Sequence, residues 1–110
     1  MAVSDEDRDE LRELIKTATE AVDTAEDAAE RAEEAAELSD QREVQTVETA
    51  AFDAREALRE TRGADSISDA RRAQRRAQRA ARRASKAVEA IEQRKVEREQ
   101  GNDDGNDDGT

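Results

Sequence analysis

The sequence predicts an all-α protein: a three-helix up-down-up bundle, or a helical hairpin or coiled coil, with packing seams rich in alanine. Alanine, the best helix former because it loses no side-chain entropy, occurs 22 times. Proline is absent, and the four glycines fall only at positions 63, 101, 105 and 109. A net charge of −11 with few bulky apolar residues would by itself indicate disorder. The near-exclusion of both helix breakers from the first hundred residues favours long helices instead.

The first expected helix covers residues 5–38. Its apolar residues recur at alternating spacings of three and four, as in a heptad repeat: Leu11, Leu14, Ala18, Ala21, Ala25, Ala28, Ala32 and Ala35. Ser4 is placed to cap the first turn, and the three acidic residues after it suit the positive end of the helix dipole. Continued beyond residue 38, the same register meets only polar residues, so the seam should break near Ser39.

The second expected helix covers residues 41–62 in a new register. Its apolar positions are Val44, Val47, Ala51, Ala54 and Leu58, with Thr61 as the one polar member. Asp40 and Glu43 have the spacing of a capping box at its start. Gly63 is placed to end the helix in a left-handed conformation.

The third expected helix covers residues 66–99 and begins after Ser66 or Ser68. Its seam consists of Ala70, Ala73, Ala77, Ala80, Ala84, Ala87 and Ile91. Residues 101–110 repeat a Gly-Asn-Asp-Asp tetrad that can bury nothing, so we expect a disordered acidic tail after one helical domain, 1–100. Because alanine methyl groups bury little surface, the bundle should be marginally stable and its helix axes closely spaced.

Charge is divided unequally between the helices. Residues 5–38 carry 14 acidic and 4 basic residues, whereas residues 64–100 carry 6 acidic and 11 basic ones. An antiparallel contact between the first and third helices, with positions summing to about 105, would pair these charges better than a parallel contact. The connectivity of an up-down-up bundle makes the two helices parallel. We rank the monomeric bundle first, because surface ion pairs contribute only ~0–1 kcal/mol each, and antiparallel pairing between two chains second.

No pattern in the sequence indicates catalysis. Histidine, cysteine, tyrosine and tryptophan are absent, so nothing is available to activate a nucleophile or to transfer protons near neutral pH. We expect a protein that is not an enzyme and has no cofactor, no metal site and no small-molecule substrate. No apolar run approaches the ~20 residues of a membrane span, and the first residues lack a secretory signal, so we expect no membrane association and a cytoplasmic location.

The clearest functional signal is a basic run in the third helix, with no acidic residue between Asp69 and Glu89. It consists of Arg71, Arg72, Arg75, Arg76, Arg79, Arg82, Arg83 and Lys86. These side chains would pair with the acidic first helix, within or between chains, or would bind nucleic-acid phosphates. No aromatic residue is interleaved for base stacking, and the overall negative charge repels nucleic acid. Phe52, the sole aromatic residue, lies off the second seam and is a candidate anchor for a partner, although lone exposed apolar residues are ordinary.

The expected function is that of a small acidic interaction or structural protein, whose charged helix faces bind a protein partner or a second copy in a homodimer. The alternative is a nucleic-acid-binding accessory protein that uses the basic helix 71–86. Arginine outnumbers lysine 16 to 3 while acid dominates overall. Such a composition favours a halophile, because molar salt screens repulsion between carboxylates, and helical content should then rise with salt.

Overall fold

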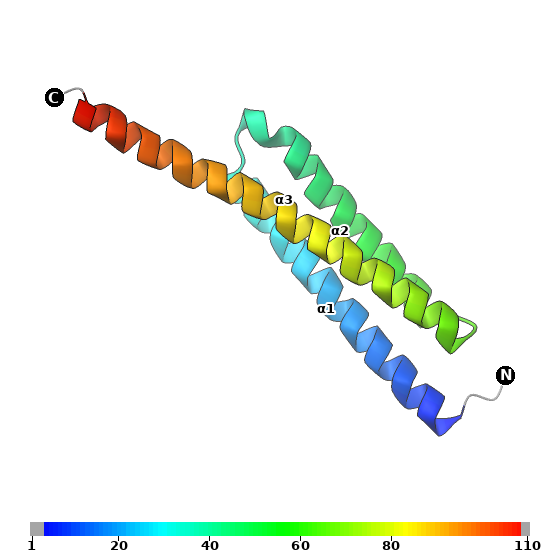
Figure 1. The fold of residues 1–110 in the computed structure, drawn as a ribbon. Coiled ribbons are helices and arrows are strands. Elements are labelled where there is room, and N and C mark those ends of the chain that lie inside the picture. The colour runs from blue at the N-terminus through cyan, green and yellow to red at the C-terminus, as the bar shows by residue number, and fades with distance from the viewer. Residues whose placement is uncertain (1–3, 109–110) are drawn as a thin grey trace.

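The computed structural model describes the backbone of residues 4–108 and the side chains of residues 4–101. Within this part of the chain there are three long helices, one short 3-10 turn and no strand: α1 (Asp5–Ala35), η1 (Leu38–Asp40), α2 (Gln41–Arg62) and α3 (Ile67–Asp108). The three helices lie side by side, and each packs against the other two (Figure 1). The predicted all-α bundle is confirmed.

Ion pairs between the helices fix their directions. Glu10 on α1 pairs with Arg71 on α3, and Arg31 on α1 pairs with Glu92 on α3, both at a separation of 61 residues. A constant difference in residue number means that α1 and α3 are parallel. The helix between them, α2, runs antiparallel to both, so the order is up-down-up, as predicted.

Serine side chains cap the N-terminal ends of two helices. The hydroxyl of Ser4 accepts a hydrogen bond from the backbone N–H of Asp7 at 3.1 Å, at the start of α1. The hydroxyl of Ser66 accepts one from the N–H of Asp69, also at 3.1 Å, just before α3. Both bonds satisfy an N–H group that lacks a partner within the helix. The predicted cap at Ser4 and the predicted start after Ser66 are therefore confirmed.

The turn between α1 and α2 differs from the prediction. α1 ends at Ala35 rather than at residue 38, because Ala36 is extended, with φ −76° and ψ 144°. The predicted capping pair of Asp40 and Glu43 does not form; Asp40 instead accepts a hydrogen bond from the backbone N–H of Glu37 at 2.9 Å. The carboxylate therefore closes the turn that precedes α2.

Gly63 ends α2 without the predicted left-handed conformation. Its φ is −96° and its ψ is 9°, and its N–H still donates to the carbonyl oxygen of Arg59 at 3.0 Å. The chain leaves the helix through a turn that any residue could adopt, so the prediction of a left-handed glycine was wrong.

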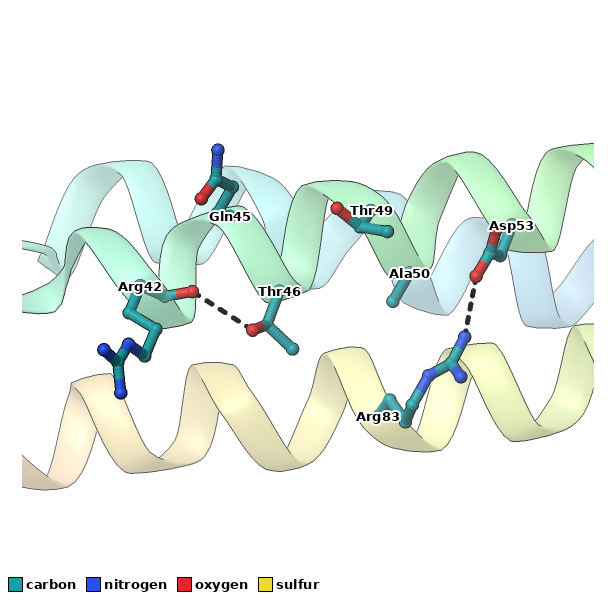
Figure 2. Close-up of a pocket in the computed structure, with 7 residues that line it drawn as sticks. All are labelled: Arg42, Gln45, Thr46, Thr49, Ala50, Asp53 and Arg83. Atoms are coloured by element: carbon teal, nitrogen blue, oxygen red, sulfur yellow. Dashed lines mark hydrogen bonds and ion pairs between the residues drawn. The ribbon is translucent and has the colours of Figure 1, made fainter.

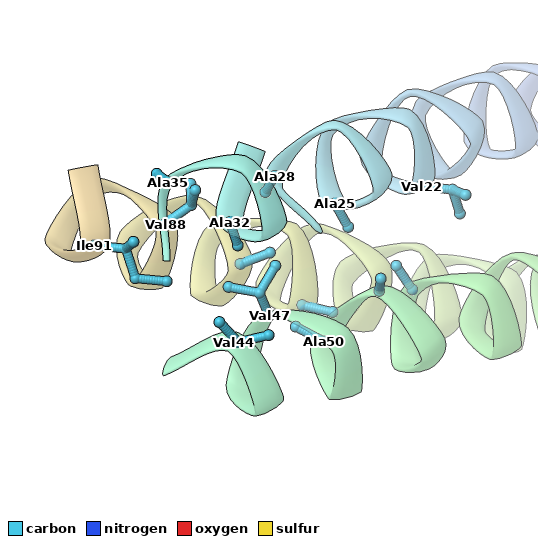
Figure 3. Close-up of a cluster of buried hydrophobic side chains, with 14 residues drawn as sticks. Val22, Ala25, Ala28, Ala32, Ala35, Val44, Val47, Ala50, Val88 and Ile91 are labelled. Atoms are coloured by element: carbon cyan, nitrogen blue, oxygen red, sulfur yellow. The ribbon is translucent and has the colours of Figure 1, made fainter. Parts of the chain in front are cut away.

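The core is built mainly from alanine, as the seams predicted. At the end nearest the α1–α2 turn, four larger side chains join the alanines: Val44, Val47, Val88 and Ile91 (Figure 3). Towards the other end, the buried cluster contains alanines alone, with Leu58 packed beside it. In the third seam the predicted Ala87 is half-buried, and Val88 takes the buried position. Burial of larger apolar surfaces stabilises more, so the end near the α1–α2 turn should be the more stable one.

Thr61 is a polar side chain at the alanine end of this core. It is fully buried, and its hydroxyl donates to the carbonyl oxygen of Ala57 at 2.8 Å. This bond to its own helix explains how the second seam accepts a polar member.

The third helix continues to Asp108, beyond the predicted end near residue 99. Its last turns extend past the α1–α2 turn and have no neighbouring helix (Figure 1). The predicted disordered tail, 101–110, falls almost wholly on residues whose side chains lie outside the described part of the chain, and it stays a prediction.

Candidate interaction surface

Three arginines of the basic run lie on the flanks of α3 and pair with neighbouring helices. Arg71 forms a bidentate ion pair with Glu10 of α1, in which Nε lies 2.6 Å from Oε2 and Nη2 lies 2.8 Å from Oε1. On the opposite flank two arginines reach carboxylates of α2, at 2.7 Å and 2.9 Å, in the pairs Arg76–Glu60 and Arg83–Asp53. The fold therefore uses part of the run within the chain.

The other five members of the run form an exposed row along the outer side of α3, which we call the basic stripe: Arg72, Arg75, Arg79, Arg82 and Lys86. Their alternating spacing of three and four places them on one helix face, opposite the alanine seam. Arg72 lies 3.7 Å from Asp69 in its own helix, and Arg75 donates only to a backbone carbonyl. Among the described residues, the remaining three form no ion pair. The basic stripe is thus left outside the contacts that hold the bundle together.

α1 carries a matching row of exposed carboxylates on its outer side, which we call the acidic stripe: Glu20, Asp23, Asp27, Glu30 and Glu34. The spacing again alternates between three and four. Within the part of the chain that the structure describes, one ion pair involves this stripe, between Asp27 and Arg31 at 3.6 Å. The excess of acid on α1 and of base on α3 therefore forms two separate stripes of equal length on one molecule.

Arg31 is an exception within the acidic half of α1. It forms a bidentate ion pair with Glu92 of α3, in which Nε lies 3.0 Å from Oε2. The hydrogen bond from Arg31 lowers the pKa of Glu92 below its usual value. Arg31 and Glu92 are 61 residues apart. A parallel alignment with an offset of 62 residues sets Glu92 against Glu30 instead, so the sequence alone did not predict this ion pair.

A second polar cluster, which the sequence did not predict, closes the bundle at the α1–α2 turn. Arg94 of α3 donates to the fully buried carboxylate of Asp40 at 2.8 Å and lies 3.0 Å from Glu43. Arg98 lies 3.5 Å from Asp40 and 3.3 Å from Glu37. The backbone N–H of Glu37, followed by Arg94, holds the pKa of Asp40 below its usual value, and Arg94 lowers the pKa of Glu43. All five side chains are engaged with each other, so this cluster stabilises the turn.

An open groove of about 450 Å³ lies between α2 and α3 and is lined by Arg42, Gln45, Thr46, Thr49, Ala50, Asp53 and Arg83 (Figure 2). Its polar groups are partly used within the protein: Asp53 pairs with Arg83, and Thr46 donates to the carbonyl oxygen of Arg42 at 3.1 Å. The groove is open, and several of its polar groups are already engaged within the protein, unlike the enclosed and mostly apolar sites that bind small molecules.

A second groove runs between α1 and α3, beside both stripes. Small and polar side chains line it from Thr17 to Thr24 on α1 and from Gln78 to Ser85 on α3. Its rims carry Glu20 on one side and Lys86 on the other. This face of the molecule thus combines a shallow floor with opposite charges on its two edges.

Phe52 is 56% exposed on α2, in agreement with its predicted place off the seam. It belongs to neither buried cluster. Two other large apolar side chains are also exposed, Leu38 in the α1–α2 turn and Val96 on α3. They come from different parts of the chain, and each alone is an ordinary surface feature.

Comparison of the chain with protein-family models, with curated proteins and with solved structures gives no match. None of the helices in the described residues is both long and apolar enough to cross a membrane. The charged stripes are therefore the features on which a functional proposal can be built.

Proposed function

We propose that this chain is a non-enzymatic interaction protein that docks the acidic surface of another protein through the basic stripe of α3. One observation carries the proposal: the five cations of the stripe are exposed on one helix face and contribute no ion pair between the helices. Exposed cations that take no part in the contacts between the helices are available for an external contact. We further propose that this contact forms in the salt-rich cytoplasm of a halophile, which the acidic, arginine-rich composition supports.

A labelled poly-L-glutamate peptide tests this proposal by fluorescence anisotropy. The stripe variant Arg79→Glu plus Lys86→Glu should lose the binding that the wild-type chain shows. Arg42→Glu plus Arg62→Glu is the matched control, because it changes the net charge equally on α2 and removes no ion pair among the described residues. Binding that is absent in the wild type, or equal in the two variants, would refute the docking role of the basic stripe.

A nucleic-acid accessory role is the second candidate, because a row of five cations about 21 Å long on one helix could also follow a phosphate backbone. A labelled DNA duplex distinguishes the two. Tight DNA binding that falls steeply between roughly 50 mM and 200 mM salt and disappears in the stripe variant would favour this second role. The protein-docking proposal expects the duplex to bind no more tightly than poly-L-glutamate, because the net charge of −11 repels both polyanions and the basic stripe holds no aromatic residue for contacts to bases.

A further inference from the structure

We infer that the partner of the basic stripe is a single amphipathic helix of another protein, which lies in the groove between α1 and α3 and completes a four-helix bundle. The inference rests on the proposed docking function and adds the shape and charge pattern of the partner. Such a helix carries acidic residues on the flank that faces α3 and basic residues on the flank that faces α1. Small or aliphatic side chains between the two flanks face the floor of the groove.

The groove is long, and no ion pair crosses its middle. Within the described residues, ion pairs join α1 to α3 at two places, Glu10–Arg71 and Arg31–Glu92. At 1.5 Å per residue these two pairs are about 30 Å apart along the helices, which is the length of a helix of about 20 residues. A docked helix of that length therefore has no ion pair to break.

The two other grooves of the bundle are crossed by ion pairs. One pair joins α1 to α2 near the middle of their contact, and three join α2 to α3: Glu26–Arg55, Glu43–Arg94, Asp53–Arg83 and Glu60–Arg76. A helix laid in either of these grooves would displace such pairs. The groove between α1 and α3 is therefore the one of the three that accepts a fourth helix.

The floor of the groove is compatible with close approach. Two adjoining hollows of about 240 Å³ and 370 Å³ share three lining residues, Thr24, Ala81 and Arg82, and so form one continuous groove. Small side chains line it: Ala21 and Thr24 on α1, and Ala81 and Ser85 on α3. Small residues allow helix axes to come close, so the rims of the groove can reach the flanks of a docked helix.

Gln74 adds a polar group without a partner to this floor. It comes four residues before Gln78, which lines the groove, and therefore lies one turn further along the same face of α3. Gln74 is only 8% exposed, and its side-chain amide forms no hydrogen bond with the described residues. Buried amides are normally hydrogen-bonded. A polar side chain of the docked helix satisfies this amide, which gives the groove one specific contact besides its charges.

The two rims of the groove carry opposite charges. The acidic rim on α1 consists of residues at steps of seven, which keep to one helix face: Glu13, Glu20 and Asp27. Three members of the basic stripe form the opposite rim on α3: Arg75, Arg82 and Lys86. Glu89 follows Lys86 and ends this rim. A helix with one sign of charge is repelled by one of the rims. A helix with one acidic and one basic flank is attracted by both, as at the e and g positions of a coiled coil.

A second copy of this chain does not supply such a helix. Each of its three helices already packs against the other two. The free end of α3 beyond Arg98 is shorter than the groove and contains no basic residue (Figure 1). An extended peptide fits less well, since its backbone N–H and C=O groups would meet a floor of small side chains that offers them few partners. The occupant is therefore a helix of another protein.

A designed helical peptide of about 20 residues tests the inference in the full-length chain. Its seam consists of alanine and leucine, one flank carries glutamate and the other lysine, and a fluorescent label reports binding by anisotropy. Thr24→Trp fills the floor of the groove at an exposed position, and Thr49→Trp is the matched control in the groove between α2 and α3. We expect Thr24→Trp to weaken peptide binding by about 10-fold or more, and Thr49→Trp to leave it unchanged.

Reversal of the acidic rim is the second variant. Glu13→Lys plus Glu20→Lys should weaken binding of the peptide by about 10-fold. Glu48→Lys plus Asp65→Lys is its control, because it changes the net charge equally at exposed sites away from the groove. Neither variant removes an ion pair among the described residues. The acidic-rim variant should bind poly-L-glutamate at least as tightly as the wild type, because it removes repulsion. Circular dichroism checks that every variant stays helical.

Three outcomes would overturn the inference. The first is a wild type that does not bind the peptide, and the second is equal binding by each variant and its control. The third is a wild-type dimer in light scattering that Thr24→Trp converts to a monomer, since this would assign the groove to a second copy. If poly-L-glutamate still binds through the basic stripe in these cases, the proposed docking function stands without the groove. Loss of both interactions would refute the proposed function as well.

Discussion

Replacement of Asp40 by alanine should destabilise the bundle by removing the acceptor at the centre of the α1–α2 turn. The Asp40 side chain is fully buried. Its carboxylate accepts the backbone N–H of Glu37 at 2.9 Å and a guanidinium N–H of Arg94 at 2.8 Å, with Arg98 at 3.5 Å. All three donors lose this acceptor in the variant.

The magnitude follows from these contacts. Loss of a charged hydrogen-bond acceptor costs about 1.5–3 kcal/mol, and loss of a capping side chain about 1 kcal/mol. Both arginines are partly exposed and keep a second carboxylate, so water and those partners offset part of the loss. We therefore expect Asp40→Ala to lower the free energy of unfolding by about 2–3 kcal/mol, a large share of the ~5–15 kcal/mol typical of a domain.

Urea denaturation followed by circular dichroism at 222 nm measures this change. Asp65→Ala is the control, because Asp65 is an exposed residue of the α2–α3 turn, and its replacement should change stability by less than about 0.5 kcal/mol. If Asp40→Ala is no more destabilising than this control, the turn does not depend on the hydrogen bonds of the Asp40 carboxylate.

Three further predictions concern the core, pH and salt. Ile91→Ala should cost about 2–4 kcal/mol in urea denaturation, because Ile91 is the largest fully buried side chain, whereas exposed Val96→Ala should be nearly neutral; equal effects would contradict the packing. The pKa values of Asp40 and Glu92 are lowered by folding, so their stabilisation is full above about pH 5 and is lost as pH falls further. The stability gap between wild type and Asp40→Ala should therefore narrow below about pH 5, and a constant gap would count against it. Helical circular dichroism should rise from dilute to molar potassium chloride, and equal helicity would oppose the halophile interpretation.

Periodicity predicted the helices well, because the three apolar seams are long and nearly continuous. It failed at the C-terminal end of α1, where tertiary contacts decide. Nothing in the sequence around Ala36 stops a helix; α1 ends there in the presence of a turn that Asp40 forms with Arg94, 54 residues away. The predicted left-handed Gly63 failed for a related reason, since the turn to α3 keeps a right-handed backbone.

The sequence indicated the basic run, but it could not show which arginines pair with neighbouring helices and which remain exposed. Which arginines lie on the flanks depends on which side of α3 each neighbouring helix occupies, and the periodicity of a single helix does not encode that. Arg71 meets α1 while Arg76 meets α2 on the opposite flank, so the arrangement of the bundle selects the outer five. The pairing of Arg31 with Glu92 was missed because a shift of one residue in register reverses the sign of the predicted interaction.

Fluorescence anisotropy of a labelled poly-L-glutamate peptide tests the docking role of the basic stripe most directly. The stripe variant Arg79→Glu plus Lys86→Glu alters two exposed cations that form no ion pair among the described residues. The account predicts that this variant loses the binding of the wild-type chain, whereas the α2 control Arg42→Glu plus Arg62→Glu keeps most of it. Equal binding by the two variants would contradict the docking role of the basic stripe.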